Sequence, residues 1–121
     1  MTEKGTRHET PETVMGNLVA IAEGTEWMFI AKTFAKDGFD VISEAKWYAK
    51  RGVLAGAVSF ASVSGLPGLE RIGLIKDLAT EVSDYVLAKE KKSDRDKVTA
   101  QRAQAVIKVS TDFLNSRAKA S

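Results

Sequence analysis

GVLAGAVSFASVSGLPGL, residues 52–69, is a run of eighteen residues without a charge, in a chain of 121 residues of which 28% are charged. The run follows the basic and aromatic segment KWYAKR at 46–51 and precedes Glu70 and Arg71. An uncharged stretch of this length has to be buried in a core, in a partner or in a bilayer, because apolar surface is unfavourable in water. The choice among these environments decides the fold.

The first interpretation of this run is a buried helix, or a helix followed by a turn. Gly52 and Gly56 are four residues apart, as are Ala57 and Ala61, so small residues share a helix face and allow close packing. A helix that is apolar all round has to be surrounded on all sides. Neighbours within so short a chain scarcely suffice, so we expect a second copy or a partner to bury it.

The second interpretation is a membrane segment. Trp47 and Tyr48, beside the cations of Lys50-Arg51, are typical of a belt at the membrane interface. The seven large apolar residues of the run favour insertion by only about 3 kcal/mol, and its glycines, serines and proline offset most of this gain. A span also needs about 20 apolar residues. We therefore expect no span by this segment alone.

The third interpretation is a pair of short strands, because the valines and Phe60 in the run favour β-structure. Polar and apolar residues do not alternate strictly, however, and a lone hairpin is only marginally stable. We favour the helical interpretation and keep the membrane segment as the alternative.

Capping signals and apolar stripes predict further helices around the run. The signals are Thr10-Pro11, Asp40 with Gly52 as the stop, Pro67, and Ser93-Asp94-Arg95-Asp96. The apolar stripe after Pro67 contains Leu69, Ile72, Ile75, Leu78, Val82, Tyr85 and Val86, and the last helix shows Val98, Val106, Val109, Phe113 and Leu114. The predicted fold is all-α, a small antiparallel bundle of four to five helices with a buried, uncharged, small-residue helix or turn at 52–69.

Length and composition predict one helical domain over 10–116. Residues 1–9 are polar without an apolar stretch, so we expect a flexible tail and not a secretory signal, and we expect a frayed tail at 117–121. The chain has no cysteine, which fits a reducing cytoplasm and excludes disulfides and thiol chemistry. A net charge of +2 gives no reason to expect binding to nucleic acid.

Residues that carry chemistry are few. His8 is the only histidine, and it lies in the polar tail, where a general base would lack a pocket. Glu23 and Glu26 are three residues apart, but such pairs are typical of solvated helix faces and make a weak metal site. The GLPG sequence at 65–68 lacks the Lys-Ser/Thr of a phosphate-binding loop. We expect no catalytic residue, no cofactor and no metal, and therefore no enzyme.

Bulky apolar residues instead predict contacts with other molecules. The segment Trp27-Met28-Phe29-Ile30 covers most of one helical turn, more than one core face accommodates. The predicted interaction residues are Trp27, Met28, Phe29, Trp47, Tyr48, Gly52, Gly56 and Phe60. We expect a non-catalytic, cytoplasmic helical assembly or adaptor subunit that self-associates or binds a protein partner. The alternative is a membrane-associating helical protein anchored through residues 47–69.

Overall fold

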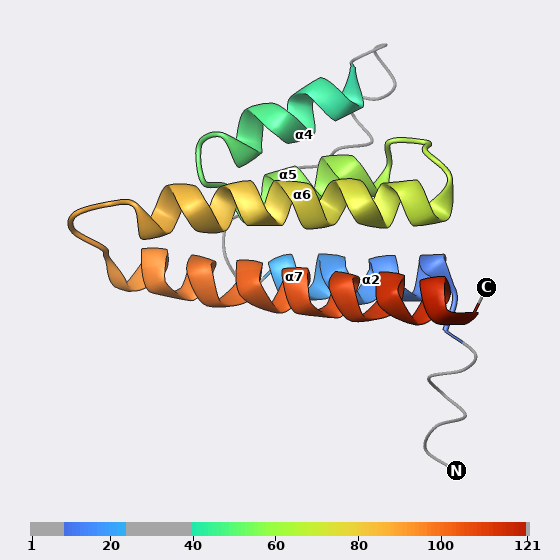
Figure 1. The fold of residues 1–121 in the computed structure, drawn as a ribbon. Coiled ribbons are helices and arrows are strands. Elements are labelled where there is room, and N and C mark those ends of the chain that lie inside the picture. Colours follow the sequence, from blue (N-terminus) through green and yellow to red (C-terminus); the bar gives the residue numbers. More distant parts are fainter. Residues whose placement is uncertain (1–8, 24–39, 121) are drawn as a thin grey trace.

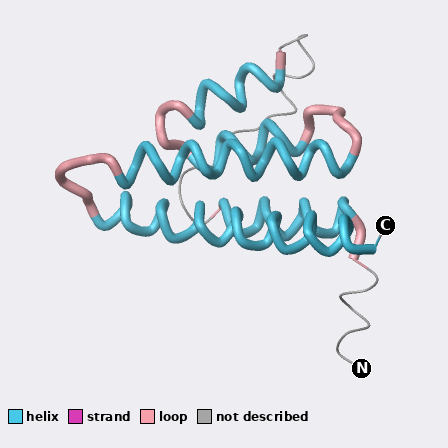
Figure 2. Tube along the Cα trace, in the orientation of Figure 1, coloured by secondary structure: helices cyan, strands magenta, loops and turns pink. Residues whose placement is uncertain are grey.

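The chain folds into helices that pack against one another, which confirms the all-α prediction. The computed structural model describes residues 9–23 and 40–120, and these residues form five α-helices. Their bounds are α2 Pro11–Ala22, α4 Val41–Ala49, α5 Leu54–Ser62, α6 Gly68–Leu87 and α7 Asp94–Ala120 (Figures 1 and 2). The described part of the chain thus has the number of helices that the sequence predicts.

Side-chain caps explain where three of the helices begin. The hydroxyl of Thr10 caps α2, and Asp40 caps α4 by accepting hydrogen bonds from the backbone N–H of Ser43 at 3.3 Å and from its hydroxyl at 2.7 Å. Before α7, the Ser93 hydroxyl accepts from the Asp96 N–H at 3.1 Å, and the Asp96 carboxylate accepts from the Ser93 N–H at 2.9 Å. This reciprocal pair is a capping box with aspartate as the acid.

The helices form three layers, with α4 on one side, α5 and α6 in the middle, and α2 and α7 on the other side (Figure 1). From α4 onward each helix runs opposite to the one before it, whereas α2 and α4 run in the same direction (Figures 1 and 2). Helix α5 contacts α2, α4 and α6. The helical part of the uncharged run, α5, therefore lies at the centre of the molecule.

The expectation that a second copy is needed to enclose this run is wrong for residues 54–61. All of these residues are buried within the single chain. The reason is that many of these side chains are small. Helix α5 is thin enough to fit among three neighbouring helices because it contains Ala55, Gly56, Ala57 and Ala61. The prediction of a buried small-residue helix followed by a turn is confirmed, and strands are not formed here.

Gly52 ends α4 as the sequence predicts. Its φ is +76°, in the left-handed region that glycine adopts without strain. The N–H of Gly52 donates to the Ala49 carbonyl at 3.1 Å, and the N–H of Val53 donates to the Tyr48 carbonyl at 3.0 Å. These two bonds make a Schellman motif, which turns the chain directly from α4 into α5.

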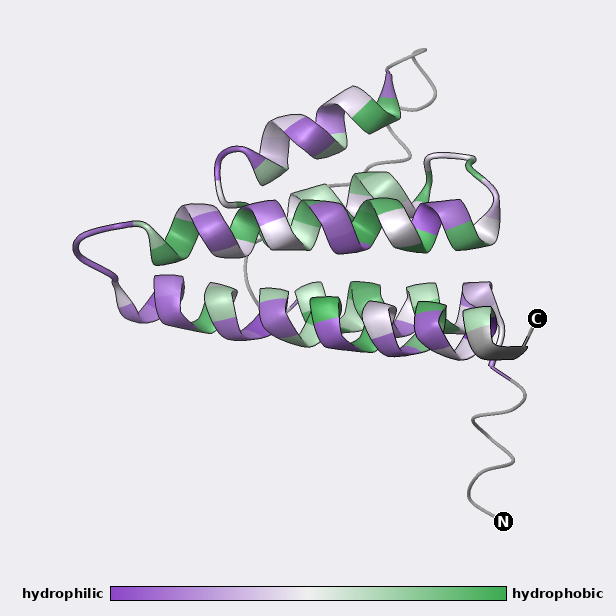
Figure 3. Cartoon of the chain, viewed as in Figure 1, coloured by the Kyte–Doolittle hydropathy of each residue, from purple (hydrophilic) through white to green (hydrophobic). Residues whose placement is uncertain are grey.

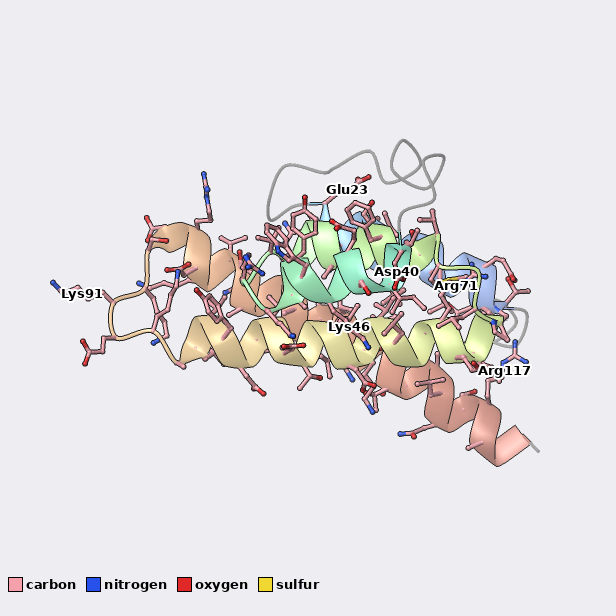
Figure 4. All side chains as sticks on the ribbon, turned by 90° about the horizontal axis from the view of Figure 1, so that it is seen from above. Glu23, Asp40, Lys46, Arg71, Lys91 and Arg117 are labelled. Carbon is pink, nitrogen blue, oxygen red and sulfur yellow. The ribbon has the colours of Figure 1, made fainter. Side chains whose placement is uncertain are left out.

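Arg71 holds the turn between α5 and α6 (Figure 4). Its guanidinium donates to the Leu66 carbonyl from Nε at 3.0 Å and from Nη2 at 2.6 Å, and Nη1 donates to the Ser62 carbonyl at 3.3 Å. A planar fork with several donors satisfies the free carbonyls of this turn. Arg71, the first cation after the uncharged run, thus has a structural role at the end of that run.

Helices α6 and α7 are in contact, and both carry hydrophobic positions along their length (Figure 3). Ile75, Val82, Val106 and Phe113 are buried, as the helical spacing predicts. Three members of the predicted stripes lie outside the core, namely Leu69, Tyr85 and Val98. At 100° per residue each of these positions is turned away from the centre of its helix's buried face, so the sequence stripe was drawn too wide.

The two ends of the described chain meet. Arg117 donates to the Glu9 carbonyl at 2.9 Å, and its guanidinium carbon lies 4.9 Å from the centre of the Phe113 ring. Helix α7 continues through Ala120, so the boundary at 116 that sequence analysis drew for a frayed tail does not coincide with a helix end. Figure 4 shows Arg117 at this end of the bundle and Lys91 at the tip of the opposite turn.

Candidate interaction surface

The predicted interaction residues do not form one surface. Trp27, Met28 and Phe29 lie outside the described residues. Gly56 and Phe60 are buried inside the chain, where the Tyr48 ring stacks on Phe60 with centroids 5.5 Å apart and an interplanar angle of 14°.

Tyr48, Gly56 and Phe60 thus form an internal contact between α4 and α5. A Cβ at Gly56 would lie 2.7 Å from Cγ of the Tyr48 ring, so only glycine lets this ring approach α5. Burial raises the pKa of the Tyr48 hydroxyl above its ordinary value, and the Glu44 carboxylate raises it further. These residues hold α4 on the bundle and do not present a free surface.

Among the predicted interaction residues that the structure describes, Trp47 is a large hydrophobic side chain that faces outward, with 46% of its surface exposed. Its ring meets the Tyr48 ring edge-on, with centroids 4.9 Å apart. The Arg51 guanidinium carbon lies 3.8 Å from the centre of the Trp47 ring, and Arg51 Nη1 donates to the Trp47 carbonyl at 3.0 Å. Contacts on two sides therefore hold the indole in one orientation, with a cation on its face.

Tyr85 lies against the α4–α5 turn. A Cβ at Gly52 would lie 2.6 Å from Cδ2 of the Tyr85 ring, so the ring rests on the bare glycine backbone. The ring is 46% exposed, and Lys89 Nζ lies 5.9 Å from its centre. We call the outward patch made by Trp47, Arg51, Gly52 and Tyr85 the aromatic surface.

The outward side of α4 is basic. Lys46, Lys50 and Arg51 are exposed at helical spacing beside Trp47, and we call these three cations the basic face. Neither lysine side chain forms a hydrogen bond or ion pair with another residue in the described ranges. A comparable lysine, Lys89, pairs with Asp96 at 3.0 Å. Within the described ranges, therefore, no ion pair occupies the two lysines of the basic face.

The outward side of α6 is acidic. Glu70, Asp77, Glu81 and Asp84 follow one another at intervals of seven, four and three residues, so they line one side of the helix. Glu70, Asp77 and Asp84 are exposed, and Glu81 is half-buried. None of the four carboxylates pairs with a cation of the described chain. We call these four residues the acidic face.

Two further observations concern the whole described chain. Within residues 9–23 and 40–120, no helix combines the length and the apolarity that crossing a membrane requires. In the same ranges, no three His, Cys, Asp or Glu side chains come together as a group able to hold a metal ion.

The sequence matches no protein-family model, and no curated protein or solved structure matches it.

Sequence reasoning missed Tyr85 and the acidic face. It assigned Tyr85 to the buried stripe of α6, although position 85 is turned well away from the direction shared by Ile75 and Val82. The acids of α6 were seen only as residues off that stripe. Counting the sign of the charges along each outward helix face would have found both the acidic and the basic face.

Proposed function

We propose that this protein is a non-catalytic helical assembly or adaptor subunit that binds another protein chain through the aromatic surface on α4 and α6. The observation that carries the proposal is the exposed Trp47 held under Arg51, together with the exposed Tyr85 that lies against the neighbouring residue Gly52. Tryptophan, tyrosine and arginine are the residues that contribute most to the binding energy of protein interfaces. Side chains that are already oriented also lose less entropy on binding.

The rest of the described molecule favours a role in binding over a role in catalysis. Helix α5 serves to fill the core, because its residues 54–61 are enclosed by the chain itself. The alternative, a membrane anchor through residues 47–69, loses its main argument, because α5 would have to leave α2, α4 and α6 to meet lipid. We include a cytoplasmic location in the proposal, on the ground that a chain without cysteine suits a reducing compartment.

The experiment that tests this proposal uses the absence of cysteine. The variant Lys50→Cys, on the basic face, has a single thiol, to which a photo-crosslinker is attached. Lys108→Cys, on the exposed side of α7, is labelled in the same way and is the matched control. Both variants lose one exposed lysine. Each variant is purified, labelled at its single cysteine, mixed with an extract of cells that express the protein, and illuminated. We expect a discrete protein adduct at position 50, identified by mass spectrometry, and none at position 108. Equal labelling at the two positions, or no discrete adduct at position 50, would overturn the proposal.

A further inference from the structure

We infer that the partner at the aromatic surface is a second copy of this chain. In the inferred dimer, the basic face of one copy lies on the acidic face of the other, with Trp47 within the contact. The inference rests on the proposed function, because it names the partner for the same surface. It goes further by giving the acidic face of α6 a role.

Charge complementarity is the argument for a second copy. The basic face carries three cations and the acidic face four carboxylates, and both lie on outward sides of their helices. Opposite charges that meet across an interface determine its orientation and its partner. An unrelated acidic partner would account for the basic face alone. A second copy accounts for both faces.

The two faces do not satisfy each other within one molecule. Helices α4 and α6 are in contact, yet in the described chain no ion pair joins Lys46 or Lys50 to a carboxylate of α6. Ion pairs do form elsewhere, between Lys89 and Asp96 and between Lys108 and Asp112 at 3.1 Å. In the described chain, ion pairs thus form at other places, and none of them occupies Lys46, Lys50 or the acidic face.

Two-fold symmetry closes such a contact. When α4 of the first copy meets α6 of the second, the same operation brings α4 of the second to α6 of the first. Each basic face then has an acidic face opposite it, and both copies of Trp47 enter the contact. The arrangement uses each face once and stops at a dimer. A net charge of only +2 per chain opposes such an approach weakly.

Reciprocal charge reversal tests the inference. The first variant is Lys46→Glu with Lys50→Glu, and the second is Asp77→Lys with Asp84→Lys. We expect wild type to be a dimer at low salt and to dissociate as salt screens the faces. Each variant alone should raise the dissociation constant at least about tenfold, because like charges then oppose each other. An equimolar mixture of the two variants should form a heterodimer, measured by light scattering and sedimentation.

The control carries the same change in charge on another face. Lys97→Glu with Lys108→Glu alters exposed positions of α7 and should leave the wild-type dissociation constant unchanged. Circular dichroism checks that every variant is folded, and the salt dependence of wild type tests the inference without any variant. A wild type that is monomeric at high concentration overturns it, as does a salt-insensitive dimer, a failure of the mixture to pair, or equal dissociation of the α7 control.

These results separate the inference from the proposed function. An adduct at position 50 with a different protein, together with a monomeric wild type, would leave the proposed function standing and refute the second copy. Absence of any discrete adduct at position 50 would refute both.

Discussion

Two glycines within helices show how differently the same residue acts in this protein. Gly16 lies in the middle of α2, and a Cβ there would meet no atom within 4 Å. Gly56 lies in α5, where a Cβ would come within 2.7 Å of the Tyr48 ring. At Gly16 the absent side chain only adds freedom to the unfolded chain, whereas at Gly56 it makes room for another helix.

We therefore predict opposite effects of the same substitution. Gly16→Ala should raise the free energy of unfolding by about 0.5–1 kcal/mol, the helix propensity difference between the two residues. Gly56→Ala should lower it by about 1–3 kcal/mol, because the Tyr48 ring has to move away from α5. Urea unfolding followed by circular dichroism measures both values. A loss of stability in both variants would show that α2 packs more closely around Gly16 than the structure indicates.

At the scale of single elements, the capping box at α7 makes a pH-dependent contribution to stability. The hydrogen bond from the Ser93 N–H lowers the pKa of the Asp96 carboxyl, and Lys89 lowers it further. A carboxyl whose pKa is lower in the folded state adds stability above its unfolded pKa, about 3.9, and this stability is lost as the pH falls through the folded pKa.

Asp96→Asn should accordingly be less stable than wild type at neutral pH, and the difference should shrink as the pH falls below about 4. Urea unfolding across the acid range measures this convergence. Asp94→Asn is the matched control, since its carboxylate forms no hydrogen bond or ion pair with the described chain. A difference between wild type and Asp96→Asn that stays constant down to the lowest pH would show that the charge of Asp96 has no part in the cap.

The α6–α7 hairpin is the element pair that the core depends on most. Ile75 is fully buried and Phe113 is nearly so. Replacing either with alanine should lower the free energy of unfolding by about 2–5 kcal/mol, the range for large-to-small changes in a core. Lys97→Ala, at an exposed position of α7, should change it by less than about 0.5 kcal/mol. Chemical unfolding of the three variants compares these values, and similar losses at buried and exposed positions would contradict the assigned helix faces.

At the scale of the whole molecule, Trp47 reports what covers the aromatic surface. In a Trp27→Phe variant it is the single tryptophan, and it is half exposed in one chain. Its emission should move to shorter wavelength as the protein concentration rises and the second copy covers it. At low concentration, neither neutral nor anionic vesicles should shift the emission. A shift with anionic vesicles alone would show that the basic face binds lipid, at about 1 kcal/mol per cation.

Sequence analysis was most successful where the deciding residues are close neighbours in the chain. The caps at Asp40 and Ser93 and the stop at Gly52 were predicted and confirmed, because each depends on backbone groups within a few residues. It was least successful at the surface. Tyr85 was assigned to the core, because the exposure of a side chain cannot be read from local spacing. Gly56 was assigned to a contact between molecules, because local spacing does not show which distant residues lie beside it.

The sequence by itself determined that this protein is all-α, where its capped helices begin, and that the central part of the uncharged run is buried, although Val63 and Leu69 near its end are exposed. These properties follow from hydrogen bonds and apolar spacing over three or four residues. Only the tertiary structure decided what hides α5, and which charged helix faces are left outward. Enclosure depends on which distant segments meet, and α2, α4 and α6 close around α5 because its small residues let them approach.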